Sequence, residues 1–270
     1  MMGDITIGQY FPGNSVLHRM DARMKTVLIF ILMVAVFFCK SFISIGVATV
    51  FTLMIVLMSG IRFSVILKGM RPILFVVIFT ALLNLFYGTG EPLVKFWIFK
   101  ITENGIFNAV FMALRILLLV VIGLMLTYTT TPTQLTDAME SLMKPLRVFR
   151  LDTHSLAMTM TIALRFIPIL IEEVEKITAA QKSRGADMEN GTLVKRVKAL
   201  VPVLIPLFIS SFRRANELAD AMECRCYRGG EGRTKMKVSH LAALDYISLA
   251  VVLVYVAGII ALKILTVDVI

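Results

Sequence analysis

The sequence predicts an all-α polytopic membrane protein with about five transmembrane helices. Hydrophobic residues make up 58% of its 270 residues, more than the roughly 45 to 50% of ordinary soluble domains, and the mean hydropathy is +0.84. The charges are unevenly placed, because residues 129–240 hold 17 of the 28 Lys and Arg and 12 of the 18 Asp and Glu. We therefore expect this segment to lie outside the hydrocarbon core, and its near balance of charge argues against nucleic-acid binding.

Apolar runs separated by charged segments mark the expected spans, at residues 27–39, 41–59, 72–87, 106–128 and 241–264. The first run is short, since a span needs about 20 residues. Pro72 predicts the start of the third helix, because proline is favoured in a first helical turn. Residues 91–104 mix Lys and Glu with aromatic rings, as at a headgroup boundary. Arg115 in the fourth run either faces the helix bundle or extends to the interface, and a substrate-gating role is a further alternative.

The distribution of Lys and Arg among the loops predicts the orientation of the chain. The positive-inside rule places the amino terminus, the 62–71 loop and residues 129–240 in the cytoplasm. Five spans then leave the carboxyl terminus outside. We expect three domains: four spans in 1–128, a cytoplasmic or interfacial domain in 129–237, and a last span in 238–270 that packs on the first domain.

The middle domain is expected to contain one short and two long amphipathic helices. Thr131 and Gln134 flank Pro132 with capping-box spacing, so the short helix should start at Pro132 and stop near Lys144. The long helices are expected over 153–183 and 192–225. Each contains interior proline, namely Pro168 in the first and Pro202 and Pro206 in the second, and we expect kinks there.

Each long segment ends on an arginine between small residues, in Ser183-Arg184-Gly185 and Cys224-Arg225-Cys226. The planar, five-donor guanidinium fits a docking role, because it can enter a groove and pair with carboxylates or carbonyls. The alternative is an ordinary helix end, at which a cation is favourable by about 0.3 to 1 kcal/mol. Repetition of the pattern at matching helix ends favours docking.

Other chemistries lack support in the sequence. Cys224 and Cys226 are too closely spaced for a usual zinc site and have no second pair, so no metal is expected. The three histidines lie in separate segments, and Gly229-Gly230-Glu231-Gly232 lacks the Lys of a phosphate-binding loop. A self-sufficient permease should carry polar or broken-helix features within its spans, and an intramembrane enzyme should carry clustered His, Asp or Glu at membrane depth.

The chain resembles the transmembrane T subunit of an energy-coupling factor (ECF) transporter, an importer of the ATP-binding cassette kind, over nearly its whole length. The resemblance rests on Leu17-His18-Arg19-Met20-Asp21-Ala22-Arg23-Met24-Lys25, Ala163-Leu164-Arg165-Phe166-Ile167-Pro168, Ala180-Gln181-Lys182-Ser183-Arg184-Gly185-Ala186-Asp187 and Ala221-Met222-Glu223-Cys224-Arg225-Cys226-Tyr227-Arg228-Gly229. The last two blocks are similar to the paired Ala-Arg-Gly motifs of that family. The chain departs from the motif at three positions: Ser183 and Cys224 each replace Ala, and Cys226 replaces Gly.

The resemblance implies a non-catalytic scaffold for uptake of a vitamin or metal ion. Two ECF ATPase subunits (A and A′) would bind ATP and Mg and hydrolyse the ATP. Each would receive one of the two arginines, Arg184 or Arg225, and a separate membrane S component would bind the substrate. This chain itself would bind no cofactor and no nucleic acid, and would contact the lipid bilayer. The apolar residues expected to contact the S component are Leu156, Met160, Ala163, Ile167, Leu170, Val203 and Leu207.

Overall fold

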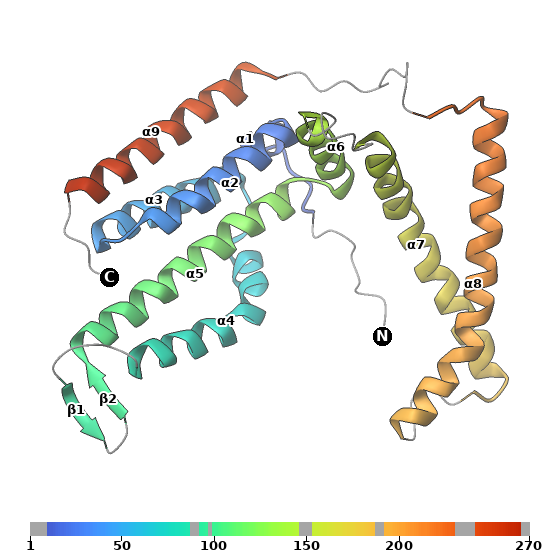
Figure 1. The fold of residues 1–270 in the computed structure, drawn as a ribbon, viewed down its shortest axis with the longest axis horizontal. Helices are drawn as coiled ribbons and strands as arrows, with labels where there is room; N and C mark the ends of the chain where they lie inside the picture. The colour runs from blue at the N-terminus through green and yellow to red at the C-terminus, as the bar shows by residue number, and fades with distance from the viewer. Residues whose placement is uncertain are drawn as a thin grey trace. The chain divides into compact units, whose positions relative to one another are not determined.

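The structure is a computed structural model that describes residues 10–86, 92–96, 99–145, 153–186, 192–229 and 241–265. Within these ranges the chain forms nine α-helices and one β-hairpin, which confirms the all-α class with a small exception (Figure 1). The chain divides into two compact units, Met1–Ala138 with Val238–Ile270 and, separately, Met139–Lys237. We call them the membrane unit and the helix-pair unit and describe each by itself.

The membrane unit contains most of the long apolar helices. Its elements are α1 Val16–Arg19, α2 Ala22–Phe38, α3 Phe42–Ser59, α4 Phe63–Phe86, β1 Pro92–Phe96, β2 Phe99–Thr102, α5 Glu103–Thr129 and α9 Ala243–Leu265. The antiparallel hairpin of β1 and β2 was not predicted, although β-branched and aromatic residues on both sides of positions 97–98 are typical of one.

The predicted start of the third span at Pro72 is wrong. α4 begins at Phe63, so Pro72 lies inside the helix. Gly60 ends α3 with a left-handed φ of 69°, and Val65 N then donates to Arg62 O at 2.9 Å to open α4. A three-residue link thus replaces the expected loop. The proline is tolerated because only one backbone hydrogen bond is lost within a long apolar helix.

Among the residues that the structure describes, five helices are long and apolar enough to cross a membrane, namely α3, Phe63–Leu85 of α4, α5, α7 (Thr153–Ser183) and α9. The number agrees with the prediction but the set does not. α2 has only 17 residues, even though it begins at Ala22, five residues before the predicted start of the first span. α7, in contrast, was expected to be an interfacial helix. Length and composition alone do not distinguish α7 from a span.

Two cations hold α2 and α5 together as antiparallel neighbours. Lys25 is 3% exposed, and its Nζ donates to Thr129 O at 3.0 Å and to Thr130 Oγ1 at 3.1 Å. At the other end, Arg115 Nη2 donates to Cys39 O. Both acceptor carbonyls belong to a helix C-terminus, where a cation is favourable. Each helix therefore stabilises the end of the other, which identifies Arg115 as a residue that faces the bundle.

A buried aspartate fixes α9 to the start of α2. Asp245 is 1% exposed and accepts hydrogen bonds from Asp21 N at 3.0 Å and from Ala242 N at 2.8 Å. The first bond joins residues 224 positions apart in the sequence. Lys25 lies close enough to Asp245 and Asp21 for electrostatic attraction. One polar cluster thus joins α2, α5 and α9.

The close contact of α4 with α5 depends on Gly69. A Cβ added at this position would lie 2.2 Å from Tyr128 Oη and 3.2 Å from Leu124 Cδ1. Tyr128 is buried and also packs edge to face with Phe11, at 5.2 Å between ring centroids. The tyrosine ring therefore has little freedom to move away.

The helix-pair unit contains α6 (Pro132–Met143, which begins in the membrane unit), α7 and α8 (Leu193–Cys224). The predicted capping box of α6 is confirmed, because Gln134 N donates to Thr131 Oγ1 at 3.2 Å and Thr131 N donates to Gln134 Oε1 at 3.1 Å. The predicted extents of α7 and α8 are also confirmed to within one residue.

α7 and α8 run antiparallel (Figure 1). Arg214 Nη2 donates to Glu173 Oε2 at 2.9 Å. Nearer the other end of the pair, Gln181 Nε2 donates to Pro202 O at 3.3 Å. That carbonyl lacks its usual helical donor, because Pro206 has no N–H. The prolines thus leave an acceptor that a side chain of the neighbouring helix satisfies.

Candidate docking site

α7 ends in a Schellman motif with Arg184 at the C-cap. Gly185 N donates to Lys182 O, and Ala186 N donates to Gln181 O, both at 3.0 Å. These two bonds satisfy carbonyls that the helix end would leave free. Gly185 has a φ of 87°, in the left-handed region that the motif requires. Arg184 is exposed at the end of this turn.

α8 ends in the same motif with Arg225 at the equivalent position. Cys226 N donates to Glu223 O at 2.8 Å, and Tyr227 N donates to Met222 O at 3.0 Å. Cys226 has a φ of 57°, so it adopts the conformation that Gly185 adopts at the end of α7. The departure from glycine therefore leaves the turn intact, and Arg225 is exposed as Arg184 is. The proposed pair of equivalent arginines has a shared backbone geometry.

Cys226→Gly is expected to stabilise the last turn of α8 by up to about 1 kcal/mol, because a non-glycine residue in the left-handed region costs about 1 to 2 kcal/mol and glycine loses part of that gain through unfolded-state entropy. Amide hydrogen exchange at Cys226 and Tyr227, whose N–H groups close the motif, should slow severalfold.

The matched control is Cys224→Gly, two residues away inside the helix. There glycine is expected to destabilise the last turn by roughly 0.3 kcal/mol, the difference in helix propensity between cysteine and glycine, and to speed the same amides. Equal effects of the two substitutions would contradict the conformational explanation.

The two arginines lie at opposite ends of the antiparallel pair. Gln181 faces Pro202, while Phe166 of α7 and Met222 of α8 line a common groove near the other end. Arg184 lies three residues beyond Gln181 in the chain, and Arg225 lies three residues beyond Met222. At 1.5 Å per helical residue the two C-caps are separated by up to about 40 Å. One groove on one partner cannot receive both.

The apolar residues predicted to contact the S component fall in different environments. Leu156 and Met160 are exposed, whereas Val203 is only 4% exposed within the unit. Leu170 lines the groove between α7 and α8. Ala163 is exposed, and Ile167 and Leu207 are half-buried. The predicted set therefore does not form one outward surface.

Sequence reasoning missed a larger outward surface on α8, which we call the α8 apolar face. All its members are large, hydrophobic and exposed, and they recur at helical spacing: Val194, Val197, Val201, Leu204, Ile205, Phe208, Ile209 and Phe212. The spacing of three and four was a usable indication. The tertiary structure adds that α7 covers Val203 and leaves this face open.

No group of three or more His, Cys, Asp and Glu suited to a metal ion occurs among the residues that the structure describes. Cys224 and Cys226, whose spacing argued against a zinc site, are free and exposed. The chemistry available at the helix ends is therefore that of cationic hydrogen-bond donors.

Apolar helices of membrane-spanning length, joined in one chain to an antiparallel helix pair with exposed arginine ends, define a polytopic membrane protein. The family model for CbiQ, described as cobalt transport protein, matches residues 13–236. The chain belongs to the family of energy-coupling factor transporter transmembrane proteins, which confirms the resemblance drawn from its motifs.

Three relatives illustrate the similarity, and each is named energy-coupling factor transporter transmembrane protein EcfT. The chain is 47% identical to that of Ruminiclostridium cellulolyticum, over 97% of this chain and 98% of the relative. For Clostridium kluyveri the identity is 49%, with 95% and 96% covered. For Bacillus subtilis it is 44%, with 88% and 90% covered.

Proposed function

We propose that this chain couples two ATPase subunits to a separate substrate-binding S component in an ECF-type importer of a vitamin or metal ion. The observation that carries the proposal is the pair of identical helix ends, each of which presents an exposed arginine at the C-cap. The separation of up to about 40 Å between them suits two partner subunits side by side, each with one groove. The partners bind ATP and Mg and supply the hydrolysis.

The α8 apolar face supports the membrane side of this proposal. Exposed apolar residues over about five turns of one helix are unfavourable in water, and a surface of this size indicates a partner or a membrane. We assign it to the S component together with the exposed Leu156 and Met160 of α7. In this arrangement α7 lies at the cytoplasmic face with the rest of the helix-pair unit, and the 17-residue α2 spans the membrane together with α3, α4, α5 and α9. The amino terminus is then inside and the carboxyl terminus outside.

Motion then passes through the helix pair as a lever. When ATP closes the two ATPase subunits, the arginine ends move with them. The Glu173–Arg214 ion pair at 2.9 Å and the bond from Gln181 to Pro202 O tie α7 to α8, so displacement at either end is transmitted to the apolar face. The S component in contact with that face reorients in the bilayer.

Arg184→Ala and Arg225→Ala test the proposal in the co-expressed complex. Each variant is expected to retain the S component and to lose ATPase co-purification at least tenfold, because truncation of one partner of an interfacial charge pair costs about 2 kcal/mol or more. Substrate uptake should fall in parallel.

Arg165→Ala on α7 and Arg213→Ala on α8 are matched controls, since both arginines are exposed but lie away from the helix ends. Normal ATPase co-purification and uptake in both end variants would refute the docking role. Uptake by the purified chain alone in liposomes would instead establish a self-sufficient permease.

A further inference from the structure

We propose that the membrane unit binds one anionic phospholipid, with an acyl chain in a crevice between α3 and α9 and the phosphate at the basic residues around α1. This site is separate from the helix ends and does not depend on the proposed coupling function.

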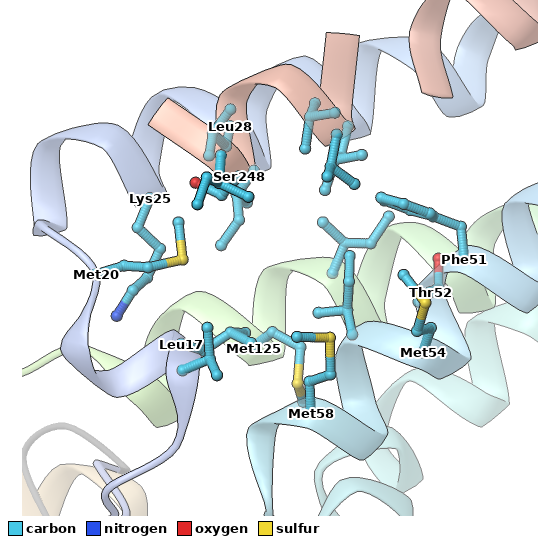
Figure 2. A pocket seen from close by; sticks show the side chains of 18 of the residues that line it. Leu17, Met20, Lys25, Leu28, Phe51, Thr52, Met54, Met58, Met125 and Ser248 are labelled. Atoms are coloured by element: carbon cyan, nitrogen blue, oxygen red, sulfur yellow. The ribbon is translucent and has the colours of Figure 1, made fainter. Parts of the chain in front are cut away.

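The crevice has a volume of about 350 Å³ and is lined by residues of α1, α2, α3, α5 and α9, with Met20 (Figure 2). Its floor is buried, and Leu28, Leu32 and Val252 contribute to it. Its rim is exposed on both sides, at Met54 and Met58 of α3 and at Ile247 and Val251 of α9. The crevice is therefore open to the surroundings of the membrane unit.

One end of the crevice is closed by an aromatic stack. The rings of Phe51 and Tyr255 lie 4.2 Å apart and nearly parallel, so α3 and α9 touch there. From this contact the lining continues along α3 to Met58 and along α9 to Leu244. The other end reaches α1 and Lys25 (Figure 2). A long, narrow space of this shape suits an extended chain.

Water is a poor occupant, because the polar groups of the lining already have partners. Thr52 Oγ1 donates to Ala48 O at 2.8 Å, and Ser248 Oγ donates to Asp245 O at 2.8 Å. Lys25 Nζ is bonded to the end of α5. A buried water needs two to four polar partners. The remaining lining is apolar.

The position of the rim selects a lipid tail as the occupant. α3 and α9 are both candidate membrane spans, so the fluid at the opening is the bilayer interior. Four methionines line the space, at positions 20, 54, 58 and 125, and their unbranched side chains adapt to an irregular guest. An acyl chain can therefore enter sideways without crossing a polar barrier.

Charge at the open end favours an anionic headgroup. Arg19 and Arg23 flank the crevice residues Met20 and Lys25 in the chain, and neither arginine is buried. Of the nearby acids, Asp245 accepts from two backbone amides, and Asp21 accepts from Arg23 N at 2.9 Å through Oδ1 while its buried Oδ2 has no hydrogen-bond partner among the described residues. The three cations Arg19, Arg23 and Lys25 outnumber these two carboxylates. Basic residues next to a cytoplasmic membrane surface attract anionic lipids.

The test is native mass spectrometry of the full chain, with any partners that co-purify, from membranes of equal phosphatidylglycerol and phosphatidylethanolamine content. One phospholipid, enriched at least threefold in phosphatidylglycerol, is expected on the wild type. Met58→Trp and Val251→Trp fill the rim and should lower its retention at least fivefold. Leu57→Trp and Val254→Trp are matched controls on the outward faces of the same helices, both about three-quarters exposed (73%), and should retain it.

Several outcomes would overturn the proposal: no retained phospholipid on the wild type, a partner peptide cross-linked into the crevice, or equal losses in rim and control variants. Equal retention of the two lipids, unchanged by Arg19→Gln with Arg23→Gln, would overturn the anionic assignment. A photoreactive phosphatidylglycerol with a diazirine in its tail provides a readout on the wild type. Its cross-links should map to the crevice-lining segments of α2, α3, α5 and α9 and not to α4.

Discussion

Lys25→Met is expected to destabilise the membrane unit by about 3 to 5 kcal/mol, the cost of removing one partner from a buried charged cluster. Methionine preserves much of the side-chain volume, so loss of packing contributes little. The substitution leaves the Thr129 carbonyl without its donor and the buried Asp245 without its cation. Three helices meet at this cluster, and the effect should spread to α9, whose packing partners α2 and α3 are remote from it in the sequence.

The measurement is thermal unfolding of the purified chain in detergent. Lys68→Met provides the control, because Lys68 is an exposed lysine of α4, and its replacement should leave the midpoint nearly unchanged. Hydrogen exchange should show faster exchange at the first turns of α9 in Lys25→Met. Equal midpoints for the two variants would mean that the buried cluster contributes no net stability.

Gly69→Ala is expected to destabilise the packing of α4 on α5 by about 3 kcal/mol or more, at the upper end of overpacking effects. The added Cβ would lie 2.2 Å from Tyr128 Oη, and the buried ring is also packed against Phe11. Alanine has the higher helix propensity, by about 1 kcal/mol. Local propensity therefore predicts the opposite sign, and thermal unfolding decides between the two effects.

A second substitution provides a rescue. Tyr128→Phe removes the clashing oxygen, and the nearest ring atom, Cζ, is then 3.4 Å from the new Cβ. The double variant should recover most of the stability lost in Gly69→Ala, and Tyr128→Phe alone should have a smaller effect. Gly46→Ala is a control, because nothing lies within 4 Å of a Cβ at that position. Additive effects of the two substitutions would exclude the clash as the cause.

Local patterns predicted the start of α6 and the end of α7 better than the start of α4. The capping box at Thr131 and Gln134 and the stop at Gly185 are encoded by neighbouring residues, and both are present in the structure. Pro72 was misinterpreted because proline is compatible with either a first turn or a helix interior. The position of Pro72 in its helix depends on where α3 ends. Because α3 ends at Gly60, α4 can begin at Phe63, and Pro72 then lies in the helix interior.

Faces of helices were less predictable than the helices themselves. Apolar spacing does not distinguish Val203, which was predicted to contact the S component, from the residues of the α8 apolar face, which were missed. Only the antiparallel contact with α7 decides that Val203 is covered and Phe208 is left exposed. In the same way, the sequence showed a cation in α5 at Arg115 without showing that its acceptor is the end of α2.

By itself the sequence determined the all-α membrane class, the extents of α7 and α8, and the arginine at each of their ends, because these features depend on hydrophobic periodicity and on hydrogen bonds between residues a few positions apart. Only the tertiary structure decided that the two helices run antiparallel, with their arginines at opposite ends, and that Asp245 joins Asp21 across 224 positions. Contacts between distant residues depend on which apolar faces pack together, and no local pattern encodes that choice.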